Sequence, residues 1–549
     1  MSTSKTTAKA KEPKVDNQRV SDGTLDHQRK FDPQDDALMA VTPIDGRYRS
    51  RTRALERYFS EYALIHYRLR AEVEWYLSLA ANPEIDALPA IAASTAKRLR
   101  ALYTEFTLGD ARRVKELEAE TNHDVKALEY FLKEKIAALD AGLPLEMVHF
   151  ACTSEDINNL AYALLLKEFV ENELLPTLDR ITNELASIAH RYKSIAMVAR
   201  THGQEASPTT VGKEFAVFAN RLGRQVKHLR DQEYLGKANG AVGNLNAHRF
   251  AYPNVDWLAH SRRFVESLGL VWNPLTTQIE SHDFLAELFH TVVRVDTVLL
   301  GFARDIWGYV SLGYFTQKTV AGEVGSSVMP HKVNPIDFEN CEGNLGLATA
   351  LFDHLATKLP ISRWQRDLTD STAVRAVGTA FGHVVVALSS LERGLKKLQL
   401  NPDRVAADLE GEKGWEILAE AIQTLMRRYG LERPYEQLKD LTRGRSVDRQ
   451  MIEEFIAGLP LDADAKAVFA RLEPRNYLGY AIELVERFDE LERLPHDHAG
   501  GLALEVLFRR LAVDGDCAGA GLDPDAGDGG LALAGGVRAG VCGHGFVES

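Results

Sequence analysis

Apolar positions along this chain recur mostly at steps of three and four residues, the spacing of one face of a helix. The pattern begins near Leu55 and dominates thereafter, while alternating strand patterns are scarce. It is clearest from His282 to Val310, where the repeating residues are Leu285, Leu288, Val292, Val295, Leu299, Phe302 and Ile306. This heptad-like repeat predicts a long helix packed lengthwise against others.

Two further long helices are expected in the same region. One should begin at Ser207-Pro208, since Ser can cap a helix and Pro suits its first turn; its apolar stripe is Val211, Phe215, Phe218, Leu222, Val226 and Leu229. The other should begin near Thr153, with Asp156 three residues on as in a capping box; its stripe is Ile157, Leu160, Ala161, Leu164 and Leu165. Three such helices predict an elongated central bundle.

The two ends of the chain lack this pattern. Residues 1 to about 38 are polar without an apolar face, and from about Leu511 the chain is rich in Gly, Ala and Asp and contains no Lys. The N-terminal segment is predicted to be disordered, and the tail is predicted to be either disordered or a sequence artefact. The predicted divisions are a disordered extension (1–38), an N-terminal helical domain (39–142), a central long-helix bundle (143–395), a C-terminal helical domain (396–490) and a C-terminal extension ending in the low-complexity tail (491–549).

Composition narrows the function. A chain of 549 residues with 45% hydrophobic content can bury a large core. No apolar run looks long enough to cross a bilayer and no signal-like segment opens the chain, so a cytoplasmic location is expected. Four scattered cysteines without a CxxC pair argue against a disulfide framework, a metal site and redox chemistry. The net charge of −13 argues against broad nucleic-acid binding, and an acidic substrate would need local Arg, Lys and His residues in a cleft.

Four polar stretches between the helices are candidates for chemistry: TNHDVKA (121–127), TSEDINN (153–159), RTHGQ (200–204) and AGEVGSSVMPHKVNP (321–335). By residue type alone, the last is more often a solvated loop than one that closes on a ligand. His202 likewise has two interpretations, a histidine satisfied at a helix start or a proton donor near neutral pH.

The motifs carry a resemblance that changes this balance. GSSVMPHKVNP (325–335) resembles the mobile-loop signature of the fumarase/aspartase superfamily. TPIDGRY (42–48), TNHDVKA, HFACTSEDINN (149–159), RTHGQ and SRWQRDLTDS (362–371) resemble the adenylosuccinate lyase family, in its longer bacterial type. The similarity runs from about Val41 to about Glu490. It implies an all-α, fumarase/aspartase-like fold of three helical domains whose central bundle assembles into a homotetramer with shared active sites, for which the stripe from Leu285 to Ile306 offers an apolar seam.

The resemblance also implies roles for individual residues and no metal or other cofactor. Ser326 would be the general base and His202 the general acid, with His123 and Lys332 in supporting catalytic roles. The implied substrate contacts are Arg47, Tyr48, Asn122, His123, Asp124, Thr153, Ser154, Gln278, Ser327, Lys332, Val333, Asn334, Asn340, Arg366, Ser371, Thr372, Ala373, Val374 and Arg375.

The implied activity is elimination of fumarate from adenylosuccinate and from the succinylated aminoimidazole carboxamide ribotide. Such a reaction needs a base, an acid and cations that hold the developing dianion. Two alternatives remain: another lyase of the superfamily, such as argininosuccinate lyase, or a non-catalytic structural protein on the same fold. The motifs TNHDVKA and SRWQRDLTDS resemble only the adenylosuccinate lyase family, which argues against another lyase of the superfamily. The presence of His202, Ser326, Lys332 and Asn334 argues against a non-catalytic protein.

Overall fold

The computed structural model describes residues 37–140, 142–319, 328–329, 331–442 and 447–488. Nearly all of the predicted N-terminal extension, the residues Ser326 and Ser327, and the whole predicted tail lie outside the described residues.

The described chain is mainly helical, as the sequence predicted. The helices are α2 (Arg49–Thr52), α3 (Glu56–Phe59), α4 (Glu61–Ala80), α5 (Ala93–Thr104), α6 (Leu108–Thr121), α7 (Asp124–Leu139), α8 (Ser154–Phe169), α9 (Leu175–Arg191), α10 (Val211–Arg230), α11 (Asn246–Ala251), α12 (Trp257–Ser267), α13 (Asp283–Ser311), α14 (Ile336–Lys358), α15 (Thr369–Val374), α16 (Val377–Lys397), α17 (Pro402–Glu410), α18 (Glu412–Glu416), α19 (Ala419–Arg428), α20 (Pro434–Thr442), α21 (Arg449–Gly458), α22 (Ala463–Ala470) and α23 (Ala481–Glu486). Short turns of other helix types occupy Arg53–Leu55, Leu145–Met147 and Val170–Leu174.

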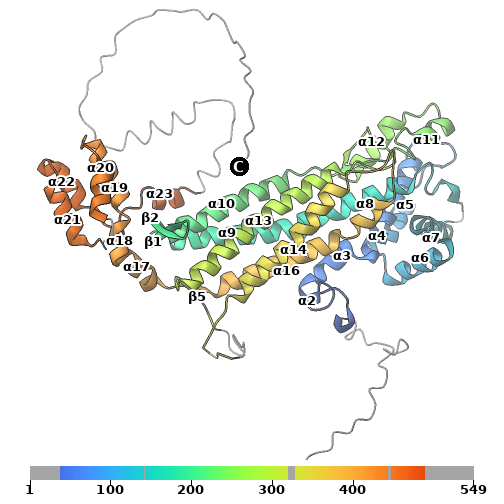
Figure 1. Cartoon of the computed structure of the whole chain (residues 1–549). Coiled ribbons are helices and arrows are strands. Elements are labelled where there is room, and N and C mark those ends of the chain that lie inside the picture. Colours follow the sequence, from blue (N-terminus) through green and yellow to red (C-terminus); the bar gives the residue numbers. More distant parts are fainter. Residues whose placement is uncertain (1–36, 141, 320–327, 330, 443–446, 489–549) are drawn as a thin grey trace, which may run out of the picture. The chain divides into compact units, whose positions relative to one another are not determined.

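Long helices run side by side in the middle of the chain (Figure 1). Helix α13 packs against α10 and α14, α14 packs against α16, and α9 packs against α10. The helix expected from His282 to Val310 is confirmed as α13, and all seven residues of its stripe are buried. Because that stripe is already covered by helices of its own chain, its predicted use as a seam between subunits is wrong.

The helix expected to start at Ser207 begins later, at Val211, so that prediction is wrong by one turn. The intervening residues form an antiparallel hairpin of β1 (Ala196–Thr201) and β2 (Gln204–Thr210), with Pro208 opposite Val198. Thr210 is the true cap, since its hydroxyl accepts a hydrogen bond of 3.1 Å from the Lys213 N–H. Sequence analysis missed the hairpin because its strands do not alternate between apolar and polar residues.

The start of α8 agrees with the prediction. Its first residue is Ser154, and the Asp156 carboxylate accepts a hydrogen bond of 2.8 Å from the Thr153 N–H, which completes the expected capping interaction. Two short strand pairs complete the fold: β3 (Leu235–Gly236) runs parallel to β4 (Val271–Trp272), and β5 (Phe315–Gln317) runs antiparallel to β6 (Leu398–Leu400).

The buried apolar side chains form two clusters. The larger one extends through α4, α8, α10, α13, α14 and α16, and a smaller one gathers residues between Leu418 and Phe469. The division into three domains stays a prediction.

One helical stretch departs from the expectation that no segment could cross a bilayer. Thr369–Lys397 is long and apolar enough by composition, with a mean hydropathy of 1.4 in its most apolar window. Of that window, 67% is buried inside the protein, where α16 packs against α14. The apolar residues of this stretch therefore serve packing between helices.

Candidate active site

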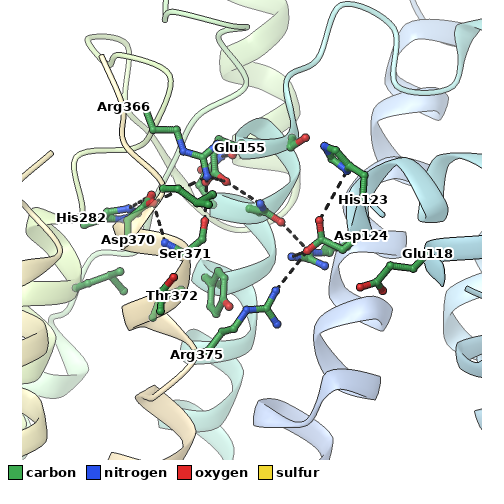
Figure 2. A pocket seen from close by; sticks show the side chains of 18 of the residues that line it. Glu118, His123, Asp124, Glu155, His282, Arg366, Asp370, Ser371, Thr372 and Arg375 are labelled. Atoms are coloured by element: carbon green, nitrogen blue, oxygen red, sulfur yellow. Dashed lines mark hydrogen bonds and ion pairs between the residues drawn. The ribbon is translucent and has the colours of Figure 1, made fainter. Parts of the chain in front are cut away.

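A cavity of about 580 Å³ opens where the starts of α7, α8 and α13 meet the segment that leads into α15 (Figure 2). The predicted site residues that line it are Asn122, His123, Asp124, Ser154, Arg366, Ser371, Thr372, Val374 and Arg375. They come from three stretches that lie far apart in the sequence. The fold therefore brings about half of the predicted contacts into one pocket.

His123 enters this pocket as the residue that caps α7. Its Nδ1 accepts a hydrogen bond of 3.1 Å from the Lys126 N–H. An imidazole nitrogen that accepts carries no proton, so the proton of the neutral ring lies on Nε2. The capping interaction thus fixes both the orientation of the ring and the atom that can donate to a ligand.

The segment that leads into α8 has an unusual backbone. His149 and Ala151 have φ angles of 59° and 57°, a region that costs non-glycine residues free energy. The buried Glu72 carboxylate lies 2.5 Å from His149 Nδ1, and the Trp75 indole N–H donates to the Phe150 carbonyl at 3.0 Å. Burial opposes the charged imidazole, but the charge of Glu72 outweighs it and raises the pKa of His149. The ion pair with Glu72 and the hydrogen bond from Trp75 therefore offset the backbone strain and hold the segment before α8 in place.

Arg366 is the most heavily bonded cation of the pocket. Its Nη2 lies 2.8 Å from a Glu155 carboxylate oxygen and donates to the Ser371 hydroxyl at 2.9 Å, while its Nη1 donates to Gln278 Oε1 at 3.2 Å. Among the described residues, its buried Nε finds no acceptor. Gln278 does not line the cavity itself, and its contact with the pocket is the hydrogen bond that it accepts from Arg366.

A second ionic group surrounds Asp124 (Figure 2). Its carboxylate lies 2.8 Å from Arg68 and 3.4 Å from Arg375, and Arg375 also lies 3.2 Å from Glu61. Burial raises the pKa of Asp124, but the charge of Arg68 and the Val125 N–H lower it more, so the net shift is downward. Asp124 is therefore ionised at neutral pH and holds Arg375 at the cavity wall.

Several pocket residues were not predicted from the sequence: Arg68, Glu118, Glu155, Asn158, Asn159, Tyr162, His282, Phe284, Leu285, Leu368 and Asp370. Helix spacing from Ser154 within TSEDINN carried a signal for Asn158, one turn further on. His282 occupies the N-cap position of α13, and its Nε2 lies 3.6 Å from an Asp370 carboxylate oxygen. Burial raises the pKa of Asp370, but the hydrogen bonds from His282 and the Ser371 N–H lower it by more, so the net shift of the pKa is downward.

Other predicted residues lie away from this cavity. The Tyr48 hydroxyl donates to Asn340 Oδ1 on α14 at 3.4 Å, and Arg47 beside it is exposed. Thr153 caps α8, and Ala373 lies on α15 outside the lining.

His202 and the segment 332–334 both lie at the end of the long helices that is remote from the pocket, just before α10 and α14 respectively. His202 and Gly203 form the two-residue turn of the hairpin, with φ angles of 54° and 75°. Arg200 donates to the Tyr314 hydroxyl at 2.8 Å, which ties the hairpin to the chain just after α13. Lys332 and Val333 are exposed and Asn334 is half-buried, just before α14.

The length of α13 separates these two regions. Its 29 residues span about 44 Å at 1.5 Å per residue, with His282 and the pocket at its start and Tyr314 beyond its end. At the start of α13, the Gln232 side-chain amide that follows α10 donates to the Phe284 carbonyl at 3.5 Å. Helix α10 therefore runs antiparallel to α13, and the turn with His202 lies at the end remote from the pocket.

Comparison with known proteins agrees with the fold and the motifs. A family model described as lyase matches residues 46–349, and one described as adenylosuccinate lyase C-terminal matches residues 362–478. Adenylosuccinate lyase of Vibrio cholerae is 54% identical over 453 residues, which cover 82% of this chain and 99% of that protein. Adenylosuccinate lyase of Escherichia coli K12 is 52% identical over 451 residues, covering 82% and 98%.

Solved structures support the fold at low sequence identity. A fumarate lyase from Mesorhizobium sp. BNC1 superposes with a TM-score of 0.63 at 20% identity, covering 80% of this chain and 97% of that one. The 3-carboxy-cis,cis-muconate lactonizing enzyme from Pseudomonas putida gives the same score at 21% identity.

Proposed function

The chain belongs to the adenylosuccinate lyase family, and we propose on this basis that it eliminates fumarate from adenylosuccinate to give AMP. As a member it is a carbon-nitrogen lyase. We extend the proposal to the succinylated aminoimidazole carboxamide ribotide, because both molecules carry a succinyl amine and a ribose phosphate. The observation that carries the proposal is the cavity that gathers His123, Ser154, Arg366 and Arg375.

The chemistry of the cavity suits a polyanion with a hydrogen-bonding middle. Guanidinium groups bind carboxylates and phosphates through paired hydrogen bonds. The start of α8 at Ser154 adds backbone N–H groups and the positive end of a helix dipole. His123, with its proton on Nε2, supplies a donor between them.

The elimination itself is assigned to residues that the family motifs select. Ser326 takes the proton from the carbon beside a carboxylate, the carbon–nitrogen bond breaks, and His202 protonates the departing nitrogen. Lys332 and Asn334 hold the carboxylates while negative charge builds up. A Ser hydroxyl is a weak base, so Ser326 needs nearby positive charge to act.

We propose that these residues meet only in a homotetramer with shared active sites. Within one chain, the pocket and His202 lie at opposite ends of helices that cannot fold back. The pocket also lacks a surplus of cations, since Arg68, Arg366 and Arg375 face the carboxylates Glu118, Asp124, Glu155 and Asp370. A polyanionic substrate therefore needs positive charge from another subunit, and an exposed Lys332 is suited to supply it.

Exposed apolar side chains on the long helices support association. They are Val217 on α10, Trp307 on α13, and Ile336 and Leu347 on α14. Burying such side chains is favourable, and symmetric assembly would cover them in every copy. We also retain the three-domain division as a proposal.

We further propose a cytoplasmic location, with neither nucleic acid nor membrane as a partner. In the described part of the chain, Cys152 and Cys341 are unpaired, as expected in a reducing compartment.

The direct test is an absorbance assay with purified full-length protein. Adenylosuccinate should give a falling ultraviolet signal as AMP forms, and the succinylated ribotide should be cleaved in the same site and compete with it. A flat trace with adenylosuccinate would reject the proposed function. Cleavage of only one substrate, without competition from the other, would reject the shared site.

A further inference from the structure

A fully buried ion pair lies behind the wall of the pocket. Lys237 Nζ lies 2.9 Å from Asp156 Oδ1, and the two side chains are 0% and 1% exposed. Removing two charges from water is costly, and an apolar pair of the same size often gives a fold at least as stable. Stability alone therefore gives no reason for this pair.

Asp156 joins two segments of the chain. Its Oδ2 accepts from the Thr153 N–H at 2.8 Å, and its Oδ1 accepts from the N–H groups of Asn239 and Gly240 at 2.9 and 3.2 Å. Lys237 Nζ also donates to the Gly240 carbonyl at 3.2 Å. The pair thus fixes the start of α8 against the segment 237–240.

The same segment continues to the substrate-binding arginine. The Ala241 carbonyl accepts from the Gln278 side-chain amide at 2.9 Å, and Gln278 accepts from Arg366. The ion pair is therefore connected to the pocket on two sides, through α8 and through Gln278.

The charge of this pair affects how strongly the start of α8 attracts an anion. The start of a helix carries about half a positive charge, which favours anions within the first turn. Asp156 is the third residue of α8, two residues after Ser154 at the cavity and within the first turn, and its negative charge alone would weaken that attraction. Lys237 cancels this charge without occupying the cavity, because it is not among the lining residues.

We propose that Lys237 is a positioning residue for the elimination reaction. Paired with Asp156, it neutralises the cap of α8, so that Ser154 and the helix start can hold an anionic group of the substrate. This inference rests on the proposed function, since it requires Ser154 to contact the substrate.

The test separates charge from stability by comparing single and double variants of the full-length enzyme. Lys237→Met leaves the Asp156 charge uncompensated, and we expect KM for adenylosuccinate to rise about tenfold while kcat changes less than about threefold. Asp156→Asn/Lys237→Met removes both charges, and its KM should return to within about threefold of wild type. Lys237→Gln keeps hydrogen-bond donors without the charge and should raise KM as Lys237→Met does.

A matched control is Lys133→Met, the same change in the Lys133–Glu129 pair of 3.1 Å on α7, whose residues do not line the cavity. Its KM should equal that of wild type. Circular dichroism and melting curves establish that each variant is folded at the assay temperature. If Lys237→Met does not fold, Lys237→Gln and the double variant decide the question.

A lower melting temperature with unchanged KM in the Lys237 variants would overturn the inference, since it would show a purely structural role. A double variant with KM as high as that of the single variants would also overturn it. The variant Ser154→Ala distinguishes failure of this inference from failure of the proposed function. If Ser154→Ala raises KM and the Lys237 variants do not, only this inference fails, whereas an inactive wild-type protein overturns the proposed function as well.

Discussion

The two ends of the long helices differ in how firmly their functional side chains are held. At the pocket end, Arg366 and Asp124 are partly or largely buried and bonded to several partners. At the other end, His202 sits on an exposed two-residue turn and Lys332 is exposed. We infer that the pocket end is already formed within a single chain. His202 and Lys332 would be surrounded by other residues only beside another subunit of the proposed tetramer.

The largest expected effect is on kcat, and it comes from two single variants that each remove one histidine, His202 at one end or His123 at the other. His202→Ala and His123→Ala should each lower kcat by about 10² to 10⁴, the range for losing a proton donor. Tetramers mixed from the two variants should regain part of the activity, because some sites then receive an intact His202 and an intact His123 from different chains. Activity would be measured after co-refolding, with mass spectrometry confirming both chains in one tetramer. Mixed tetramers as inactive as their parents would refute shared sites.

A backbone test of the pocket end is Gly243→Ala. Gly243 has a φ of 84°, and an added Cβ would collide with the Thr276 carbonyl oxygen. The strain and overpacking should destabilise the fold by about 3 kcal/mol. Because this segment also supports Gln278 through Ala241, activity of the remaining folded enzyme should fall too. A melting temperature equal to that of wild type would contradict a rigid pocket end.

Acid should weaken the pocket end through Asp124. Its pKa is lowered in the fold, so its ionised form stabilises the native state above the ordinary carboxyl pKa of about 3.9, and this contribution disappears as pH falls below that value. Asp124→Asn should therefore melt below wild type at pH 7, and the gap should narrow as pH falls from about 4 to 3. Melting curves across this range check the prediction, which a gap independent of pH would exclude.

The smallest expected effect is at the other end. Gly203 has a φ of 75°, but an added Cβ meets nothing within 4 Å, so Gly203→Ala should cost only the backbone strain, about 1 kcal/mol. Denaturant unfolding would measure the loss against Gly243→Ala. A cost as large as that of Gly243→Ala would show that the hairpin turn is tightly packed in the assembled protein and would remove the contrast between the two ends.

Helix periodicity predicted the central bundle well because the stripes on α8, α10 and α13 are regular and fully buried. The hairpin was missed because Pro208 looked like the first turn of a helix, although Gly203 is the residue that a two-residue hairpin turn favours at its second position.

Site residues in continuous motifs, such as Asn122 to Asp124, could be selected by resemblance. Arg68 and Tyr162 could not, because only tertiary packing brings them to the cavity. Burial raises the pKa of Tyr162 to about 12, an effect that no local sequence pattern indicates.

The length of α13 also limits how this protein can change during evolution. One inserted residue would turn everything after it by about 100° and advance it by about 1.5 Å. Such an insertion would displace Tyr314 and the following segment relative to His282. Insertions and deletions between relatives should therefore collect in connections such as 81–92, between α4 and α5, where extra residues leave the spacing of both ends unchanged.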